Sequence, residues 1–146
     1  MGVVKVKQQA IIIDIDGTLA LRLGRGPFDW NRVGEDLPNE PIIELVRILL
    51  RAKPTWTGLF VSGRDEVCRD QTEAWLMHHV YGFRRDQLFM RPFRDNRADY
   101  VVKDEIYSRD IAPRWQVMYV LDDRRQVVNM WRGRGLTVLD VAGYEG

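Results

Sequence analysis

The chain has 146 residues, 45% of them hydrophobic and 29% charged, with a formal net charge of +1 at pH 7. These values predict one soluble globular domain and indicate no charged partner from bulk charge alone. The longest apolar stretch is interrupted by Glu44 and Arg47, so no membrane span is expected. A single cysteine, Cys68, excludes an internal disulfide and fits a reducing compartment, and the N-terminus lacks the apolar core of a signal peptide.

The hydrophobic pattern alternates between strands and helices. Residues 9–15 are predicted to form a buried strand, followed by a long irregular connection over 17–38 and a helix over 41–52. Further strands are predicted at 55–62, 87–90, 115–123 and 136–141, and further helices at 65–79, from Asp95 or Asn96 to about 107, and at 124–132. Apolar strands separated by amphipathic helices predict a single α/β domain over residues 1–146, with a parallel sheet covered on both faces.

Polar groups follow three of the predicted strands. They are Asp14 and Asp16 after the first, Ser62, Gly63 and Arg64 after the second, and Asp122 and Asp123 after the fourth. The carboxyl ends of parallel strands meet at one edge of the sheet, where such folds bind ligands. Four carboxylates at that edge would repel one another, and a divalent cation such as Mg²⁺ bound through oxygen resolves the repulsion. A site of this kind suits phosphoryl transfer, with one Asp as nucleophile and another as acid and base.

The order of these motifs resembles the haloacid dehalogenase (HAD) superfamily of phosphotransferases. The motifs are D-x-D-G-T after an apolar strand, a strand ending in Ser, a Lys, and a strand ending in D-D. Residues 61–76, 88–107 and 122–143 further resemble the 3′-phosphatase domain of phage-type bifunctional polynucleotide 5′-kinase/3′-phosphatases. The resemblance runs from Ile11 to Gly143. It implies a three-layer HAD-like (Rossmann-like) fold with a central, mainly parallel five-stranded sheet and a minimal cap.

The resemblance also implies roles for the reacting groups. Asp14 matches the nucleophile, and Asp16 matches the general acid and base. Lys103 matches the lysine that bridges nucleophile and phosphate, and Asp99, one helical turn earlier, is expected to orient it. Arg64 matches an arginine of the catalytic set.

The same resemblance places the phosphate and the metal. Phosphate or substrate contacts are implied for Thr18, Arg25, Ser62, Gly63 and Asp99. Mg²⁺ ligands are implied at Asp14, Asp16 (through its backbone carbonyl), Asp122 and Asp123. For Arg25, a phosphate contact and a plain surface position are equally favoured.

Arginine is the default cation of the chain, since only 4 of the 22 basic residues are lysines. Codon usage explains this bias more readily than phosphate binding does, so the positions of the arginines must decide. A cluster at residues 84, 85, 91, 94 and 97 is expected to be a solvated face more often than a nucleic-acid track. The tryptophans are expected in the core, except that Trp30 could line the mouth of the site.

The implied activity is an Mg²⁺-dependent phosphatase that removes 3′-phosphates from DNA or RNA ends through a phosphoaspartyl intermediate. Residues 58–65 have the glycine spacing of a P-loop but lack its Lys-Ser/Thr, so no 5′-kinase activity is expected. A separate kinase or ligase could be a partner, in the cytoplasm of a bacterium or of a phage-infected host. The alternatives are a small-molecule phosphatase or nucleotidase, and a non-catalytic module that binds nucleic-acid ends.

Overall fold

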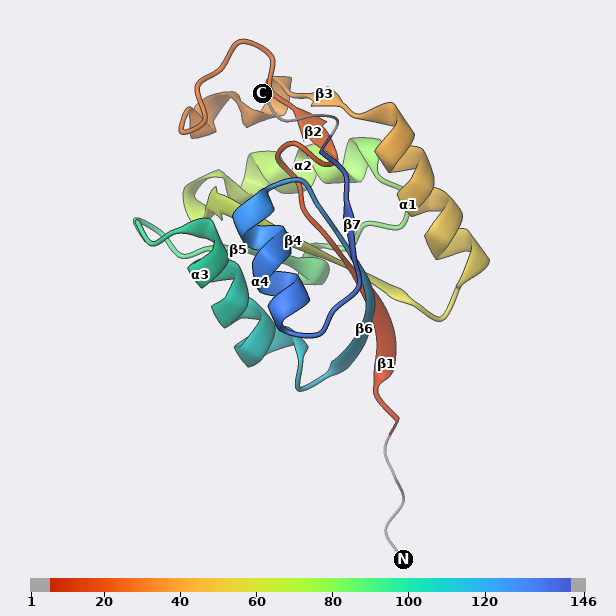
Figure 1. Ribbon diagram of the computed structural model, residues 1–146. Coiled ribbons are helices and arrows are strands. Elements are labelled where there is room, and N and C mark those ends of the chain that lie inside the picture. The colour runs from red at the N-terminus through yellow and green to blue at the C-terminus, as the bar shows by residue number, and fades with distance from the viewer. Residues whose placement is uncertain (1–5, 143–146) are drawn as a thin grey trace, which may run out of the picture.

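Five parallel strands form the central sheet in the order β5-β4-β1-β6-β7, as Figure 1 shows. The structure is a computed structural model that describes residues 6–142. Residues 1–5, which belong to the N-terminus considered above for a signal peptide, lie outside this range. The strands are β1 (Gln8–Ile13), β4 (Thr57–Asp65), β5 (Leu88–Arg91), β6 (Trp115–Asp122) and β7 (Val138–Asp140). The predicted five-stranded parallel sheet is confirmed, with β1 at its centre.

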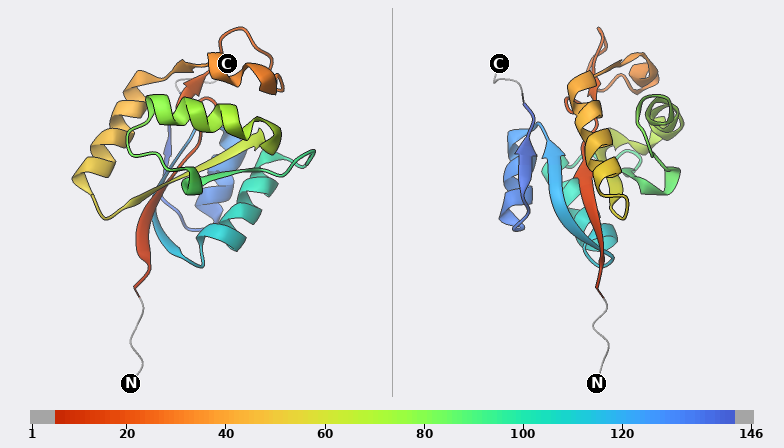
Figure 2. Two further views of the ribbon diagram at one scale, coloured as in Figure 1. Left: turned by 180° about the vertical axis from the view of Figure 1, so that it is seen from behind. Right: turned by 90° about the vertical axis from the view of Figure 1, so that its right-hand side faces the viewer.

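Two pairs of helices cover the two faces of this sheet, as the two views of Figure 2 show. The pair on one face is α1 (Glu40–Ala52) and α2 (Arg69–His79), and the pair on the other is α3 (Asp99–Ile106) and α4 (Arg125–Gly133). Because side chains alternate along a strand, Ile11 and Ile13 of β1 pack on the α1/α2 side, whereas Ala10 and Ile12 pack on the α3/α4 side. None of the helices in the described range is long and apolar enough to cross a membrane.

Residues 17–38 are more ordered than the sequence predicts. They contain the short antiparallel pair β2 (Ala20–Leu21) and β3 (Leu37–Pro38) and the 3₁₀ helix η1 (Trp30–Glu35). In Figure 1 this segment lies beyond the carboxyl ends of the strands, next to the N-terminal end of α1. It is the minimal cap that the resemblance implied.

Several element boundaries differ from the predictions. The helix predicted from Asp95 or Asn96 begins at Asp99, because the Asp95 carboxylate binds Arg97 instead of capping a helix. The remaining short helices are η2 (Glu66–Cys68), η3 (Arg85–Gln87) and the π-helical η4 (Tyr107–Ile111). Asp65 does cap the turn that it starts, since its side chain accepts a hydrogen bond from the Val67 backbone N–H.

Candidate active site

The turn after β1 aims two carboxylates at the same edge of the sheet. The carbonyl of Ile15 accepts hydrogen bonds from three backbone N–H groups, those of residues 18, 19 and 20, at 2.9–3.1 Å. Gly17 adopts φ +80°, and a Cβ there would lie 2.0 Å from Oδ2 of Asp123. Ile15 is fully buried in the core, so Asp14 and Asp16 on either side of it face the cleft.

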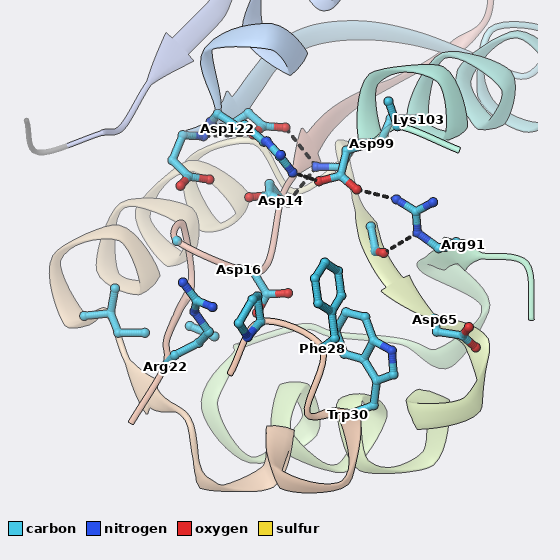
Figure 3. A pocket seen from close by; sticks show the side chains of 18 of the residues that line it. Asp14, Asp16, Arg22, Phe28, Trp30, Asp65, Arg91, Asp99, Lys103 and Asp122 are labelled. Carbon is cyan, nitrogen blue, oxygen red and sulfur yellow. Dashed lines mark hydrogen bonds and ion pairs between the residues drawn. The ribbon is translucent and has the colours of Figure 1, made fainter. Parts of the chain in front are cut away.

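Lys103 holds the carboxylate of Asp14 at the centre of the site (Figure 3). Its Nζ donates to Oδ1 of Asp14 at 2.6 Å and to Oδ2 of Asp122 at 3.0 Å. The other oxygen of Asp14 accepts from the Thr18 hydroxyl at 3.0 Å, and Asp122 also accepts from the Trp131 indole at 3.2 Å. Asp14, Lys103 and Asp122 are all at least 95% buried, so the nucleophile predicted from the sequence is held in a fixed orientation.

Three carboxylates gather beside this lysine. Oxygens of Asp14, Asp122 and Asp123 lie within 4.8 Å of one another. Burial, and next the negative charge of Asp122, raise the pKa of Asp14 well above its usual value, although Lys103 opposes the rise. Burial also raises the pKa of Asp123. One ammonium therefore faces three carboxylates, and oxygen ligands that carry an excess of negative charge suit a hard divalent cation such as Mg²⁺.

The carboxylate of Asp16 turns away from that cluster, toward two arginines. Nη2 of Arg64 lies 2.9 Å from Oδ1 of Asp16, and Nη2 of Arg25 lies 3.0 Å from the same oxygen. Burial disfavours the charged form, but Arg64 first and then Arg25 outweigh it and lower the pKa of Asp16. Any metal contact of Asp16 is therefore left to its backbone carbonyl, as the resemblance implies.

Asp36 is the residue of this network that sequence reasoning missed. Its side chain is fully buried and accepts from Nε and Nη2 of Arg25 and from Nη2 of Arg64, each at 2.8 Å. Asp36 lies in the segment predicted to be irregular, where nothing in the spacing marks it. Arg25 and Arg64 therefore connect Asp16 at the cleft to a buried carboxylate behind it. Arg64 is fully buried and Arg25 is 5% exposed, so neither is a plain surface residue.

Asp99 lies against the end of β4 and pairs with two arginines rather than with Lys103. Asp99 forms ion pairs with Arg91 and Arg124, and no described hydrogen bond joins it to Lys103. The prediction that Asp99 orients Lys103 is therefore wrong, because two guanidinium groups satisfy its carboxylate. A Cβ on Gly63 would lie 2.6 Å from Oδ1 of Asp99, so glycine permits this close approach.

Ser62 and Arg91, at the same edge of the sheet, are both buried and hydrogen-bonded within the chain. The Ser62 hydroxyl is 1% exposed and accepts a hydrogen bond from the Arg64 backbone N–H at 3.0 Å. Arg91, assigned above to a solvated cluster, is 9% exposed and donates to the Gly63 carbonyl at 2.8 Å. Arg84 forms an exposed ion pair with Asp86, and Arg85 pairs with Glu73, whose side chain is 14% exposed, so the arginine cluster is not one continuous track.

The carboxylates of Asp14, Asp16, Asp122 and Asp123 line a cleft of about 1430 Å³ at the carboxyl edge of the sheet. Asp14, Asp16 and Lys103 lie on its inner wall, and the segment from β2 to the start of η1 forms another wall with Phe28 and Trp30. Figure 3 shows both aromatic rings on the side of the cleft nearest that segment. The expectation that Trp30 lines the mouth of the site is confirmed.

The comparisons with known proteins agree with this geometry. Residues 8–145 match the family described as the polynucleotide kinase PNKP phosphatase domain of the HAD group. A putative bifunctional polynucleotide kinase/RNA ligase of Autographa californica nuclear polyhedrosis virus is 34% identical over 125 residues, which is 85% of this chain and 18% of the viral protein.

Among solved structures, a chain of the Pnkp1/Rnl/Hen1 complex is 33% identical with a TM-score of 0.86, over 96% of this chain and 48% of that one. This chain therefore spans about half the length or less of these relatives.

More distant structures share the fold. The tungstate-bound class C acid phosphatase from Bacillus anthracis is 15% identical with a TM-score of 0.64, over 95% of this chain and 68% of that one. The HAD domain of Lem4 from Legionella pneumophila is 12% identical with a TM-score of 0.56, over 95% and 88% of the two chains. With this fold, and with residues 8–145 matched, the chain belongs to the family of HAD phosphatase domains found in polynucleotide kinase/phosphatases.

Proposed function

We propose that this phosphatase removes 3′-phosphates from the ends of DNA or RNA, with Mg²⁺ as cofactor and Asp14 as nucleophile. The observation that carries the proposal is the contrast between two carboxylates of one turn. Asp14 is held by Lys103 beside two more acids, whereas Asp16 is held by two arginines. The match to relatives named as a polynucleotide kinase/RNA ligase and as an RNA repair complex supports a nucleic-acid substrate.

The reaction takes place in two steps. An oxygen of Asp14 attacks phosphorus, the bond to the 3′-oxygen breaks, and Asp16 gives its proton to that oxygen. In the second step Asp16, now ionised, takes a proton from a water molecule that attacks the phosphoaspartate, and inorganic phosphate leaves. Arg25 and Arg64 stabilise the ionised form of Asp16, which is the form that acts as base in the second step. Asp16 can carry the proton of the first step only when substrate binding loosens these contacts.

The donor set described above fits Mg²⁺. Asp14, Asp122 and Asp123 would hold the cation, together with the backbone carbonyl of Asp16. When bound, the cation supplies positive charge that keeps Asp14 ionised and offsets the charge of the phosphoryl oxygens. Lys103 serves the same end from within the chain, since its ammonium touches the attacking carboxylate directly.

A panel of 3′- and 5′-phosphorylated DNA and RNA oligonucleotides, together with mononucleotides and sugar phosphates, tests the proposal when each is incubated with Mg²⁺. Phosphate release is expected from 3′-phosphorylated ends, to stop with EDTA, and to be lost in Asp14→Asn. The control variant Asp86→Asn changes an exposed acid that does not line the cleft and should keep full activity. Preferential release from mononucleotides or sugar phosphates would favour the small-molecule phosphatase, and tight binding without release would favour the end-binding module.

A kinase or ligase partner is part of the same proposal. The viral relative is named for kinase and ligase activities, and this chain spans 18% of it. A 3′-phosphatase prepares a 3′-hydroxyl, which is the group that a ligase then joins. Copurification of a ligase with the tagged protein would support such a partnership.

A further inference from the structure

Phe28 is an exposed aromatic side chain inside the catalytic cleft. The residue is 80% exposed, although burial of a phenylalanine is strongly favourable. It lines the same cleft as Asp14 and Asp16. In Figure 3 the ring rises from its loop into the cleft, on the side where Asp14 and Asp99 lie. An apolar ring at that position suits a ligand that has a flat, apolar face close to the reacting phosphate.

The loop that carries Phe28 is held in place on both sides. Before it, Arg25 is buried and bound to Asp36 and Asp16. The backbone N–H of Gly26 donates to Oδ2 of Asp29 at 3.1 Å, and the N–H of Asp29 donates back to the Gly26 carbonyl at 3.2 Å. The ring is therefore presented by a braced turn, so a ligand that stacks on it meets little entropic cost of ordering the loop.

Trp30 supports the ring from behind. The two ring centroids are 6.0 Å apart with an interplanar angle of 83°, which is an edge-to-face pair. Trp30 is partly buried and packs against the core cluster on the α1/α2 side of the sheet. The pair thus links the exposed ring to the core.

Cationic side chains line the same cleft. Arg22, Arg97 and Arg124 are exposed lining residues. Arg97 is paired with Asp95, and Arg124 with Asp99. A nucleotide has the matching pattern, because its base has an apolar face and its phosphates are anionic. A cleft of about 1430 Å³ also exceeds the 300–1,000 Å³ that encloses a typical small ligand. Sugar phosphates offer no flat apolar face for Phe28.

We propose that Phe28, braced by Trp30, is the stacking platform for the nucleobase of the nucleotide that carries the scissile phosphate. This inference rests on the proposed 3′-phosphatase function and adds a recognition element to it. The base of a 3′-nucleotide is one sugar ring away from the phosphorus that Asp14 attacks, so the platform and the nucleophile act on the same residue of the substrate. Because every base has a π-face, the platform confers little sequence preference.

The test compares two substrates that differ only at the terminal base. One is a 3′-phosphorylated oligonucleotide, and the other has an abasic sugar as its 3′-phosphorylated end. Phe28→Ala should raise KM for the base-bearing end about 5- to 150-fold, the range for loss of one base–aromatic stack, and should leave KM for the abasic end nearly unchanged. Values of kcat should change little on either substrate, because Phe28 makes no contact with the reacting carboxylates.

Matched variants separate stacking from a general effect. Phe28→Trp should retain a low KM, whereas Phe28→Leu keeps an apolar side chain without the π-face and should lose most of the preference for the base. Phe93→Ala removes another exposed phenylalanine, 59% exposed and outside the residues that line the cleft, and should behave as wild type. In an Asp14→Asn background, fluorescence anisotropy should show the same order of affinities without turnover.

The outcomes distinguish this inference from the function on which it rests. If wild type releases no phosphate from any 3′-phosphorylated end, the proposed function is wrong. If wild type is active but Phe28→Ala raises KM equally for both ends, the platform is wrong while the function stands. The same holds if Phe28→Leu keeps the wild-type KM for the base-bearing end. Loss of self-association in Phe28→Ala, measured by sedimentation, would assign the ring to an interface between two copies and would also overturn the platform.

Discussion

Replacing Asp36 with Asn should destabilise the protein strongly, although Asp36 is absent from the cleft lining. The carboxylate is fully buried between Arg25 and Arg64, whose side chains are 1% and 0% exposed. One oxygen accepts from Nε of Arg25, and the other accepts from Nη2 of both arginines. Asparagine keeps the shape, but its NH₂ group would face at least one guanidinium N–H, and the negative charge is lost.

The magnitude follows from the burial of the two arginines. In Asp36→Asn the two buried guanidinium groups keep only one carboxylate partner, that of Asp16, whose side chain is 36% exposed. Breaking a buried ion pair by removal of one partner costs about 3–5 kcal/mol. An unfolding entropy of about 2.1 cal/mol/K per residue converts this cost into a Tm decrease of about 10–16 °C for a domain of 146 residues. Because Asp36 also holds Arg64 against Asp16, kcat should decrease as well.

Thermal unfolding followed by circular dichroism measures the effect, with Asp86→Asn as the control. Asp86 forms an ion pair with Arg84 in which both side chains are about two-thirds exposed, so its loss should change the Tm by only a few degrees. If Asp36→Asn also changes the Tm by only a few degrees, the reasoning is refuted, because the two arginines would then not depend on the buried carboxylate.

Three further predictions concern the rest of the molecule. Gly17→Ala should weaken Mg²⁺ activation of turnover, because its Cβ would displace Asp123, whereas Gly82→Ala, at φ +74° with open space, should only reduce the Tm. Lys103→Met should decrease kcat about 10²–10³-fold in a phosphate-release assay, since it removes the cation on the nucleophile. The Cys68 thiol is buried, and burial raises its pKa, so alkylation by iodoacetamide should stay slow at mildly alkaline pH until urea unfolds the chain.

The sequence predicts the sheet and the inner wall of the site because both depend on local alternation. Residues 9–13 are a nearly continuous apolar run, which is typical of a strand buried on both faces, and β1 is the central strand. Asp14 and Asp16 flank a buried Ile15, so the alternation alone places both carboxylates on the same side. The role of Lys103 beside the nucleophile is implied by the family resemblance, and Lys103 does contact Asp14.

The supporting residues could not be predicted because their contacts are tertiary. Asp36 meets Arg64 across 28 positions of the chain, and Asp99 meets Arg124 across 25. No periodicity relates these positions. Spacing alone suggested that Asp99, four residues before Lys103, would orient that lysine, but the end of β5 brings Arg91 to Asp99 instead.

The geometry around Arg64 also explains why arginine, and not lysine, is needed at that position. Its Nε and Nη2 bind Asp16, its Nη1 donates to Thr72 at 3.1 Å, and its Nη2 also reaches Asp36. A single ammonium could not hold three partners in these separate directions, whereas the planar guanidinium fork does so. Lys103 shows the converse, since a compact ammonium fits between Asp14 and Asp122. At these two positions the choice of cation therefore follows from hydrogen-bond geometry, whatever codon usage contributes elsewhere in the chain.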